Sequence, residues 1–305
     1  MAKLGFLCDR SGDDAGPAAK RTAPDASRPP LAGRRVLRSR LWLLLPIGIV
    51  YGALAVVPLV LIVRFSLVGG LTQYREVLSS PLLAHIVENT VVISITTTVI
   101  AVLLGYLLAA ALWRSGPRMR VLLLILVLLP FWTGVLVKNF AWAALLQDNG
   151  AINELLRIIG PSHEALPLLH NRLAVIIGMV HYVLPYAVFP IYTVMLSIDD
   201  RLERAAKSLG ASAFSVAWLV IMPLTLPGVY AAGLLVFIIS TGFFITPVIL
   251  GGPSDMMVAN LVDFYAHQLV DFNRAAALAV LIVMVISVLV FAYQRTPKEG
   301  QYGAV

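Results

Sequence analysis

Long stretches without a charged residue dominate the chain from residue 41 onward. They are Leu41–Val63, Asn89–Trp113, Val121–Val137, Leu173–Ile198, Ser208–Ser254 and Ala275–Gln294. A helix needs about 20 apolar residues to cross the hydrocarbon core of a bilayer, and five stretches meet or approach that length. The third continues beyond Lys138 as "NFAWAALLQ", and the fifth holds part of a polar segment as well as a span. The pattern predicts an all-α integral membrane protein with six transmembrane helices in residues 41–295.

The helices that cross the membrane can be bounded more closely. The predicted spans are Leu41–Phe65, Thr90–Trp113, Val121–Gln147, Arg172–Ile198, Leu224–Leu250 and Ala275–Tyr293. A short surface helix is expected within residues 66–88, and a loop helix is expected after Gln147. Prolines and glycines gather in the fourth and fifth spans, where a cavity or a neighbouring helix can satisfy the freed backbone groups. These two helices either line a cavity or pack with ordinary kinks.

The distribution of positive charge predicts the orientation of the spans. Only 13% of the residues are charged and 59% are hydrophobic, whereas a soluble domain carries about 25% charged residues. Most of the 23 Lys and Arg residues lie before residue 41, in 114–120, in 201–207 and after residue 294. Positive residues favour the cytoplasmic side, so both termini and the segment near residue 200 are expected there. The net charge of +7 then reflects topology, and no nucleic-acid partner is expected.

The two ends of the chain are expected to be tails. Residues 1–40 are rich in Gly, Pro, Ala and charge, which predicts a disordered basic cytoplasmic tail because such a composition cannot bury a core. Residues 296–305 are predicted to form a short cytoplasmic tail.

Several catalytic and binding motifs are missing from the sequence. It contains no G-x-x-x-x-G-K-[ST] phosphate loop, no H-E-x-x-H pair and no G-x-S-x-G elbow. The predicted protein is not an enzyme and holds no metal or cofactor directly. No Asp or Glu lies within a predicted span, which argues against a secondary transporter, because ion-coupled carriers usually place ionisable groups there. His181 is the one histidine in a span, and a satisfied buried histidine is favoured over a functional one.

The segment 199–223, which begins "DDRLERAAKSLGASAFSVAW", interrupts the apolar pattern. Asp200 and Glu203 are spaced as in a capping box, which predicts a helix from about residue 201. Its apolar stripe is Leu202, Ala205, Ala206 and Leu209. Gly210 is suited to the left-handed position that ends a helix, and Ser212 can cap a second short helix. The second helix is expected to stop at "MPLTLPG", before the fifth span.

Two short helices joined at a glycine have three possible functions here. A DNA-reading helix-turn-helix is excluded because residues 214–221 offer no Arg, Lys, Asn or Gln for base edges. An interfacial loop lying on the lipid and a protruding knob that docks into a groove of another protein both remain open on physical grounds.

The stretch "RAAKSLGASAFSVAWLVIMPLTLPG" resembles the EAA loop of binding-protein-dependent ABC transporter permeases. That pattern reads E-A-A, three residues, Gly, nine residues, then I-x-L-P, and here Ala205, Ala206, Gly210 and Pro223 match it. Arg204 stands where the family usually has glutamate. Glu203 lies one place earlier, about 100° round the helix, so it is not a simple replacement. The stretches "LPFWTGVLVKNFAWAALLQDNGAINELL" and "TPVILGGP" are most similar to the spermidine/putrescine-type subfamily.

The resemblance implies a type I ABC importer permease in a bacterial cytoplasmic (inner) membrane. It implies a second homologous permease subunit, two cytoplasmic ABC ATPases that use ATP and Mg, and a periplasmic substrate-binding protein as partners, within the lipid bilayer. Segment 199–223 would then be the cytoplasmic coupling loop. The residues expected to couple it to the ATPases are Asp200, Glu203, Arg204, Ala205, Ala206, Leu209, Gly210, Ala211, Phe214 and Pro223.

The resemblance makes a polyamine the expected solute, and related permeases carry opines, other amines, phosphonates or ferric iron. A stand-alone secondary transporter or channel is the alternative of a different class. Aromatic faces attract cations, and the polar or aromatic residues expected along the pathway are Trp132, Asn139, Trp142, Tyr182, Tyr186, Phe243 and Phe244. Aromatic residues that face lipid or the interface are the alternative. Lys138 is expected to extend to the interface, or else to face the pathway and repel a cation.

Overall fold

The computed structural model describes residues 32–159 and 165–295, and every regular element in these ranges is helical. The chain divides into two units, residues 1–56 and 57–305. Helix α1 (Ala32–Ser66) runs from the first unit into the second, and it begins before the predicted Leu41. The rest of the predicted N-terminal tail and the C-terminal tail 296–305 lie outside the described residues.

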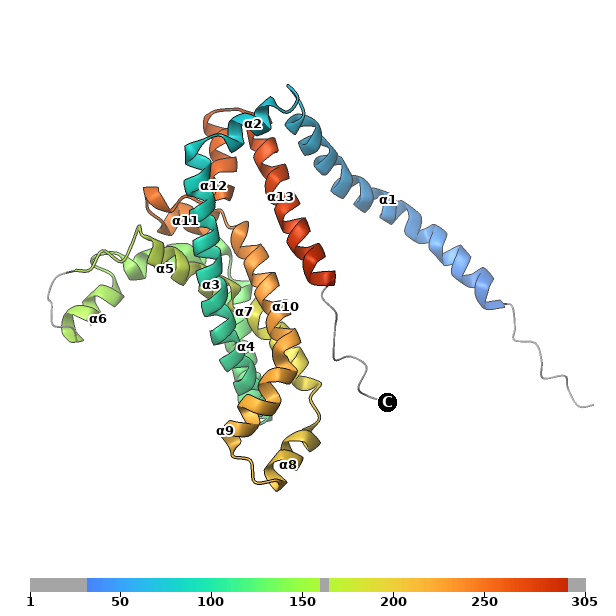
Figure 1. Ribbon diagram of the computed structural model, residues 1–305, viewed down its shortest axis with the longest axis vertical. Helices are drawn as coiled ribbons and strands as arrows, with labels where there is room; N and C mark the ends of the chain where they lie inside the picture. Colours follow the sequence, from blue (N-terminus) through green and yellow to red (C-terminus); the bar gives the residue numbers. More distant parts are fainter. Residues whose placement is uncertain (1–31, 160–164, 296–305) are drawn as a thin grey trace, which may run out of the picture. The chain divides into compact units, whose positions relative to one another are not determined.

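The second unit contains all the other helices (Figure 1). They are α2 (Thr72–Leu78), α3 (Pro81–Arg114), α4 (Pro117–Trp132), α5 (Val135–Leu146), α6 (Ala151–Ile159), α7 (Arg172–Leu196), α8 (Asp200–Ser208), α9 (Ala213–Val216), α10 (Met222–Thr241), α11 (Ile245–Leu250), α12 (Val258–Asp263) and α13 (Phe272–Arg295). Helices α3, α7 and α13 confirm the second, fourth and sixth predicted spans. Helices α2 and α6 confirm the two short helices expected between spans.

The predicted third span is two helices rather than one. Helix α4 is bent by 100° from the following segment Val135–Ile159, which begins with α5, at a break of two residues, Thr133 and Gly134. Five helices in the described residues are long and apolar enough to cross a membrane, or six if the bent pair counts as one span. The apolar pattern located the segment correctly but carried no signal for the bend.

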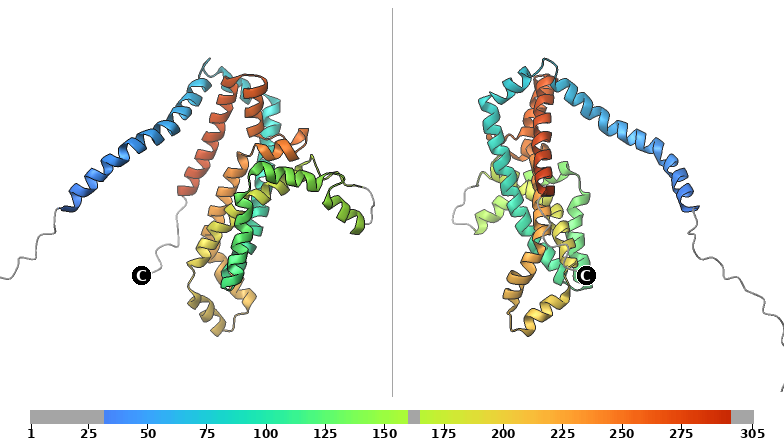
Figure 2. Two further views of the ribbon diagram at one scale, coloured as in Figure 1. Left: turned by 180° about the vertical axis from the view of Figure 1, so that it is seen from behind. Right: turned by 45° about the vertical axis from the view of Figure 1, so that its right-hand side comes forward.

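Helices α3, α7 and α10 pack side by side and form the core bundle (Figures 1 and 2). Within the most apolar window of α7, 56% of the residues are buried in the chain, against 28% for α3, so α7 is the central helix. Gly105 on α3 permits the close approach, because a Cβ at this position would lie 2.7 Å from the Cβ of Ala187 on α7. A larger residue at 105 would push the two helices apart.

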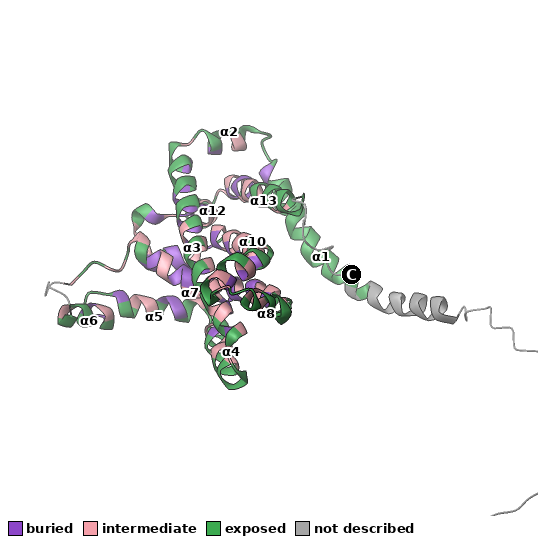
Figure 3. Cartoon of the chain, turned by 60° about the horizontal axis from the view of Figure 1, so that its bottom comes forward, coloured by how far each residue is buried: buried purple, intermediate pink, exposed green. Residues whose placement is uncertain are grey.

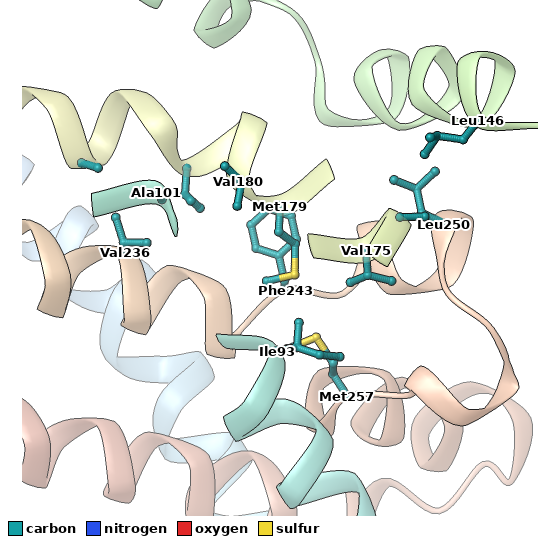
Figure 4. Close-up of a cluster of buried hydrophobic side chains, with 13 residues drawn as sticks. Ile93, Ala101, Leu146, Val175, Met179, Val180, Val236, Phe243, Leu250 and Met257 are labelled. Carbon is teal, nitrogen blue, oxygen red and sulfur yellow. The ribbon is translucent and has the colours of Figure 1, made fainter. Parts of the chain in front are cut away.

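Buried side chains are concentrated along α7, whereas α4 and α8 are mainly exposed (Figure 3). The largest apolar cluster joins α7 to α3, α10 and the segment after α10 (Figure 4). Met179, Val183 and Phe243 belong to this cluster. Phe243 therefore packs into the core at the end of α10 rather than on the membrane-facing surface.

The predicted fifth span, Leu224–Leu250, was too long at its C-terminal end. Helix α10 ends at Thr241, and α11 is a separate short helix after residues 242–244. The carbonyl of Phe244, the N-cap of α11, accepts the first helical bond from the N–H of Val248 at 3.4 Å and a second bond from the side-chain amide of Asn260 at 2.9 Å. The contact joins residues that are far apart in the chain, so the apolar pattern did not reveal it.

Candidate functional site

Helix α8 begins one residue earlier than predicted. The carboxylate of Asp199 accepts a hydrogen bond from the backbone N–H of Arg201 at 2.8 Å, and Asp199 itself is in an extended conformation. Asp199 is therefore the N-cap, and Asp200 is already inside the helix. The capping box predicted from Asp200 and Glu203 is wrong, because that pair is displaced by one position from the cap.

The turn after α8 confirms the predicted role of Gly210. Its φ is +85°, a conformation that glycine adopts without the steric cost of a Cβ. The N–H of Gly210 donates to the carbonyl of Lys207 at 3.0 Å, and the N–H of Ala211 donates to that of Ala206 at 3.1 Å. These two bonds form a Schellman motif. Ser212 then caps α9 as predicted, since its hydroxyl accepts from the N–H of Ser215 at 3.1 Å.

The helix pair α8–α9 presents apolar side chains to its surroundings. Helix α8 buries none of its residues, and Leu209 and Phe214 are 89% and 78% exposed. The rings of Phe214 and Trp218 are stacked, with centroids 6.4 Å apart and planes 3° apart. The pair lies at one end of the core bundle, away from α2 and α12 (Figure 1). Exposed apolar groups of this kind are typical of a binding surface.

Two charged residues of α8 form an ion pair within the helix, and a third is exposed. Lys207 donates to the carboxylate of Glu203 at 2.7 Å across one helical turn, and this bond lowers the pKa of Glu203 below its ordinary value. Arg204 is exposed on the same helix. The guanidinium at the position of the family's usual glutamate is therefore accessible to a partner.

The second helix of the pair does not stop at "MPLTLPG", contrary to prediction. Helix α9 continues into α10 through a π-helical turn, Ala217–Ile221, in which the N–H of Met222 donates to the carbonyl of Ala217. Pro223 lies in the first turn of α10, where its missing N–H is tolerated. The helix pair is thus joined directly to the core through α10.

A second candidate site lies at the break between α4 and α5. The ring of Tyr182 lies 6.1 Å from Tyr186 and 4.9 Å from Phe243, and Tyr186 lies 5.8 Å from Phe131. The ammonium of Lys138 is 4.5 Å from the centre of the Tyr182 ring. These five side chains are called the aromatic cluster below.

The predicted pathway residues are only partly brought together. Tyr182, Tyr186 and Phe243 belong to the aromatic cluster, whereas Trp132 is 85% exposed at the end of α4. Two other predicted residues form separate polar contacts on α5. Trp142 donates to Nδ1 of His181 at 2.9 Å, and buried Asn139 accepts from Thr246 at 3.1 Å.

The hydrogen bonds bear on two further single residues. His181 is half-buried and bonded to Trp142, which confirms the satisfied histidine. Lys138 is 9% exposed, and its ammonium donates to the carbonyl of Pro130 at 2.7 Å. Its expected place at the membrane interface stays a prediction. Phe244 is half-buried, and its carbonyl accepts from Asn260.

Comparison with known proteins identifies the family. The profile of the "Binding-protein-dependent transport system inner membrane component" family matches residues 101–296, which include the helix pair α8–α9 and the aromatic cluster. The chain belongs to this binding-protein-dependent transport family. It is an inner-membrane permease by family and by its apolar helices.

Individual relatives and a solved structure agree with the family. The chain is 35% identical over 223 residues to the spermidine/putrescine transport system permease protein PotB of Haemophilus influenzae, covering 72% of this chain and 77% of that one. It is 29% identical over 233 residues to PotB of Escherichia coli, covering 76% and 84% of the two chains. A crystal structure of a bacterial alginate ABC transporter, in complex with an alginate pentasaccharide-bound periplasmic protein, matches with a TM-score of 0.70. It is 17% identical and covers 85% of this chain and 94% of that one.

Sequence reasoning missed several polar contacts of this binding-protein-dependent permease. Arg172 on α7 contacts Asp255 at 3.4 Å and donates to the side chain of Asn89 on α3. Asn89 donates in turn to the carbonyl of Ser254 at 2.6 Å. The network fixes the loop after α11 against α3 and α7. In the sequence, Asn89, Arg172 and Asp255 are recognisable only as polar residues at the ends of apolar stretches.

Proposed function

We propose that this chain is a permease subunit of an ATP-driven importer of polyamines. The observation that carries the proposal is the 35% identity to a spermidine/putrescine permease over 77% of that protein's length. The exposed helix pair α8–α9 and the aromatic cluster supply the two features that such a subunit needs: a surface for a motor protein and side chains that attract a cation.

The complete importer contains two permease subunits in the membrane and two ATPase subunits on the cytoplasmic side. This chain pairs with a second, homologous permease, two ATPase subunits bind on the cytoplasmic side, and a periplasmic protein delivers the solute. Both termini and α8–α9 face the cytoplasm, in line with the concentration of Lys and Arg near these segments. ATP and Mg are bound by the ATPases, and this chain binds neither.

Helices α8 and α9 transmit the motion of the ATPases to the bundle. Helix α8 follows α7 after a short turn, and α9 continues into α10 through the π-helical turn. Because α7 and α10 pack against each other, a displacement of the pair acts on both central helices. Closure of the ATPase dimer on ATP then favours the outward-facing of two discrete states.

The exposed side chains of α8–α9 contact the ATPase. Leu209 and Phe214 enter its groove, and Gly210 and Ala211 set the angle between the two helices. Arg204 supplies the charge that faces the ATPase. Where most relatives of the EAA type present a glutamate, this chain offers a guanidinium, so its partner presents an acidic or carbonyl acceptor at that point.

Transport by the reconstituted complex tests this proposal. Proteoliposomes that contain both permeases and the ATPases are supplied with binding protein and labelled spermidine or putrescine, with ATP on the ATPase side. Uptake is expected to require both ATP and the binding protein, and substrate is expected to stimulate hydrolysis. Uptake driven by an ion gradient without ATP would contradict the proposal, and so would a failure to transport either polyamine.

A further inference from the structure

The carbonyl of Pro130 is an acceptor that the α4–α5 break leaves exposed to side chains. The last four carbonyls of a helix have no partner within the helix, and α4 ends two residues later at Trp132. Two side-chain groups donate to this oxygen: the hydroxyl of Thr133 at 2.9 Å and the ammonium of Lys138 at 2.7 Å. The bend therefore creates a hydrogen-bond acceptor beside the aromatic cluster.

The positive charge of Lys138 is held there without a carboxylate. Helices α4, α5, α7, α10 and α11 contain no Asp or Glu. The ammonium instead lies between the Pro130 carbonyl and the face of Tyr182, 4.5 Å from the ring centre. Carbonyl dipoles and aromatic faces are the groups that bind ammonium ions in recognition sites. The ammonium of Lys138 is thus held by one carbonyl oxygen and one ring face.

The site also reaches the surface of the chain. Tyr182 and Tyr186 are half-buried, and Phe131, which contacts Tyr186, is 51% exposed. Residues 133 and 134 at the break are exposed as well. The helices of this chain therefore do not enclose the cluster on this side.

We propose that the Pro130 carbonyl and the Tyr182 ring form the binding site for an ammonium group of the transported solute, and that Lys138 occupies this site when no solute is bound. The inference rests on the proposed function, since it needs a solute with a primary ammonium. The incoming ammonium replaces that of Lys138, whose flexible four-carbon stem lets the head withdraw. The exchange keeps one positive charge at the site, so two like charges are never held together there. Lys138 is then a tethered competitor that weakens binding and favours release.

Equilibrium binding of labelled spermidine to the whole complex in nanodiscs, without the binding protein, tests the inference. Lys138→Gln keeps an N–H donor for the Pro130 carbonyl but removes the charge that competes. Spermidine is expected to bind about tenfold tighter to this variant, since a cation–aromatic contact has a strength of this order. Lys138→Arg, the matched control, keeps the charge and is expected to bind as the unaltered complex does.

The Tyr182 ring provides a second test that does not depend on altering Lys138. Tyr182→Leu is expected to weaken spermidine binding severalfold, whereas Tyr182→Phe keeps the ring face and the affinity. The same Tyr182→Leu change is expected to abolish the gain from Lys138→Gln.

Two outcomes would overturn the inference. One is that a stably assembled Lys138→Gln complex binds spermidine no more tightly than the unaltered complex does. Lys138 would then not compete with the solute, and it would serve as a ligand for an anion or only as a cap on α4. Equal affinity in the Tyr182→Leu and Tyr182→Phe complexes would remove the ring from the site. Failure of the unaltered complex to import any polyamine is a separate result, seen in the transport assay, and it would refute the proposed function together with this inference.

Discussion

Gly210 turns the chain between α8 and α9 in a conformation that costs another residue about 1–2 kcal/mol. Its φ of +85° is the reason, since no heavy atom lies within 4 Å of a Cβ built there. Gly210→Val is expected to lower substrate-stimulated ATPase activity by roughly 5–30-fold, the factor that such strain represents. Membrane insertion should be unaffected. Parallel measurements of hydrolysis and of permease content in the membrane check both points.

Gly233 provides the matched control for Gly210→Val. It lies in α10 with a negative φ, and a Cβ there also meets nothing within 4 Å. Gly233→Ala should therefore leave coupling unchanged. If Gly210→Val couples as well as Gly233→Ala does, the left-handed turn has no part in transmission.

Asp199 and Asp200 differ in what they contribute to α8. The Asp199 side chain caps the helix through its bond to the N–H of Arg201, and loss of an N-cap costs about 1 kcal/mol. Asp199→Ala is expected to increase hydrogen exchange of the first α8 amides about fivefold. Asp200→Ala removes only a favourable charge near the N-terminus, which has an effect of roughly 0.3–1 kcal/mol, and should change exchange less. Faster exchange of the α8 amides in Asp200→Ala than in Asp199→Ala would show that Asp200 caps the helix, as the sequence suggested.

The residues of α8–α9 show which single-residue features a sequence can reveal. The turn at Gly210 and the cap at Ser212 were predicted correctly, because their hydrogen bonds join residues only three to five positions apart. The Lys138–Pro130 bond spans eight positions and exists only because the helix bends between them. The contact between Arg172 and Asp255 joins residues 83 positions apart, so it depends on the tertiary fold. Hydrogen bonds between residues close in the chain could be predicted from the sequence, whereas contacts created by bends and packing could not.

At the scale of the helix, α8 and α9 expose a surface that none of the other described helices covers. Phe214 stacks on Trp218 and is 78% exposed, as expected for an anchor in a partner's groove. Phe214→Ala is expected to weaken ATPase binding by about 2 kcal/mol, the usual loss for such an anchor. Co-purification of the ATPases with the permease, followed by titration of the purified partners, measures this loss.

Phe272 is the matched control for Phe214. It is 56% exposed at the start of α13, a helix that packs against α2 and not against α8. Phe272→Ala should leave ATPase binding unchanged. Equal binding losses in the two variants would indicate general damage to the permease rather than a docking surface.

Apolar length alone could not locate the ends of the third and fifth predicted spans. Both stretches are long enough to cross a bilayer, yet each is interrupted, at residues 133–134 and 242–244. At each interruption a side chain donates to a backbone carbonyl: Lys138 to Pro130 at the end of α4, and Asn260 to Phe244 at the start of α11. Helices without such interruptions, α3, α7 and α13, were predicted to within a few residues except at the N-terminus of α3.

At the scale of the whole molecule, the orientation in the membrane decides which partner can reach which surface. The chain has one cysteine, Cys8, so Cys8→Ser provides a background for single-cysteine labelling. Ser208 on α8 and Ser79 after α2 are both exposed, and their segments lie at opposite ends of the second unit (Figure 1). The predicted topology places Ser208 in the cytoplasm and Ser79 outside it.

A thiol reagent that cannot cross the membrane distinguishes the two positions. In right-side-out vesicles Ser79→Cys is expected to react and Ser208→Cys is not, and inside-out vesicles should reverse the result. Because the ATPases are proposed to cover α8, their presence should also slow the labelling of Ser208→Cys in inside-out vesicles, while Ser79→Cys in right-side-out vesicles is unaffected. In the predicted topology the chain crosses the membrane three times between α2 and α8, through α3, the α4–α5 pair and α7. Labelling of both positions from the same side would mean that the number of crossings is even. The α4–α5 pair would then enter and leave the membrane on one side instead of crossing it.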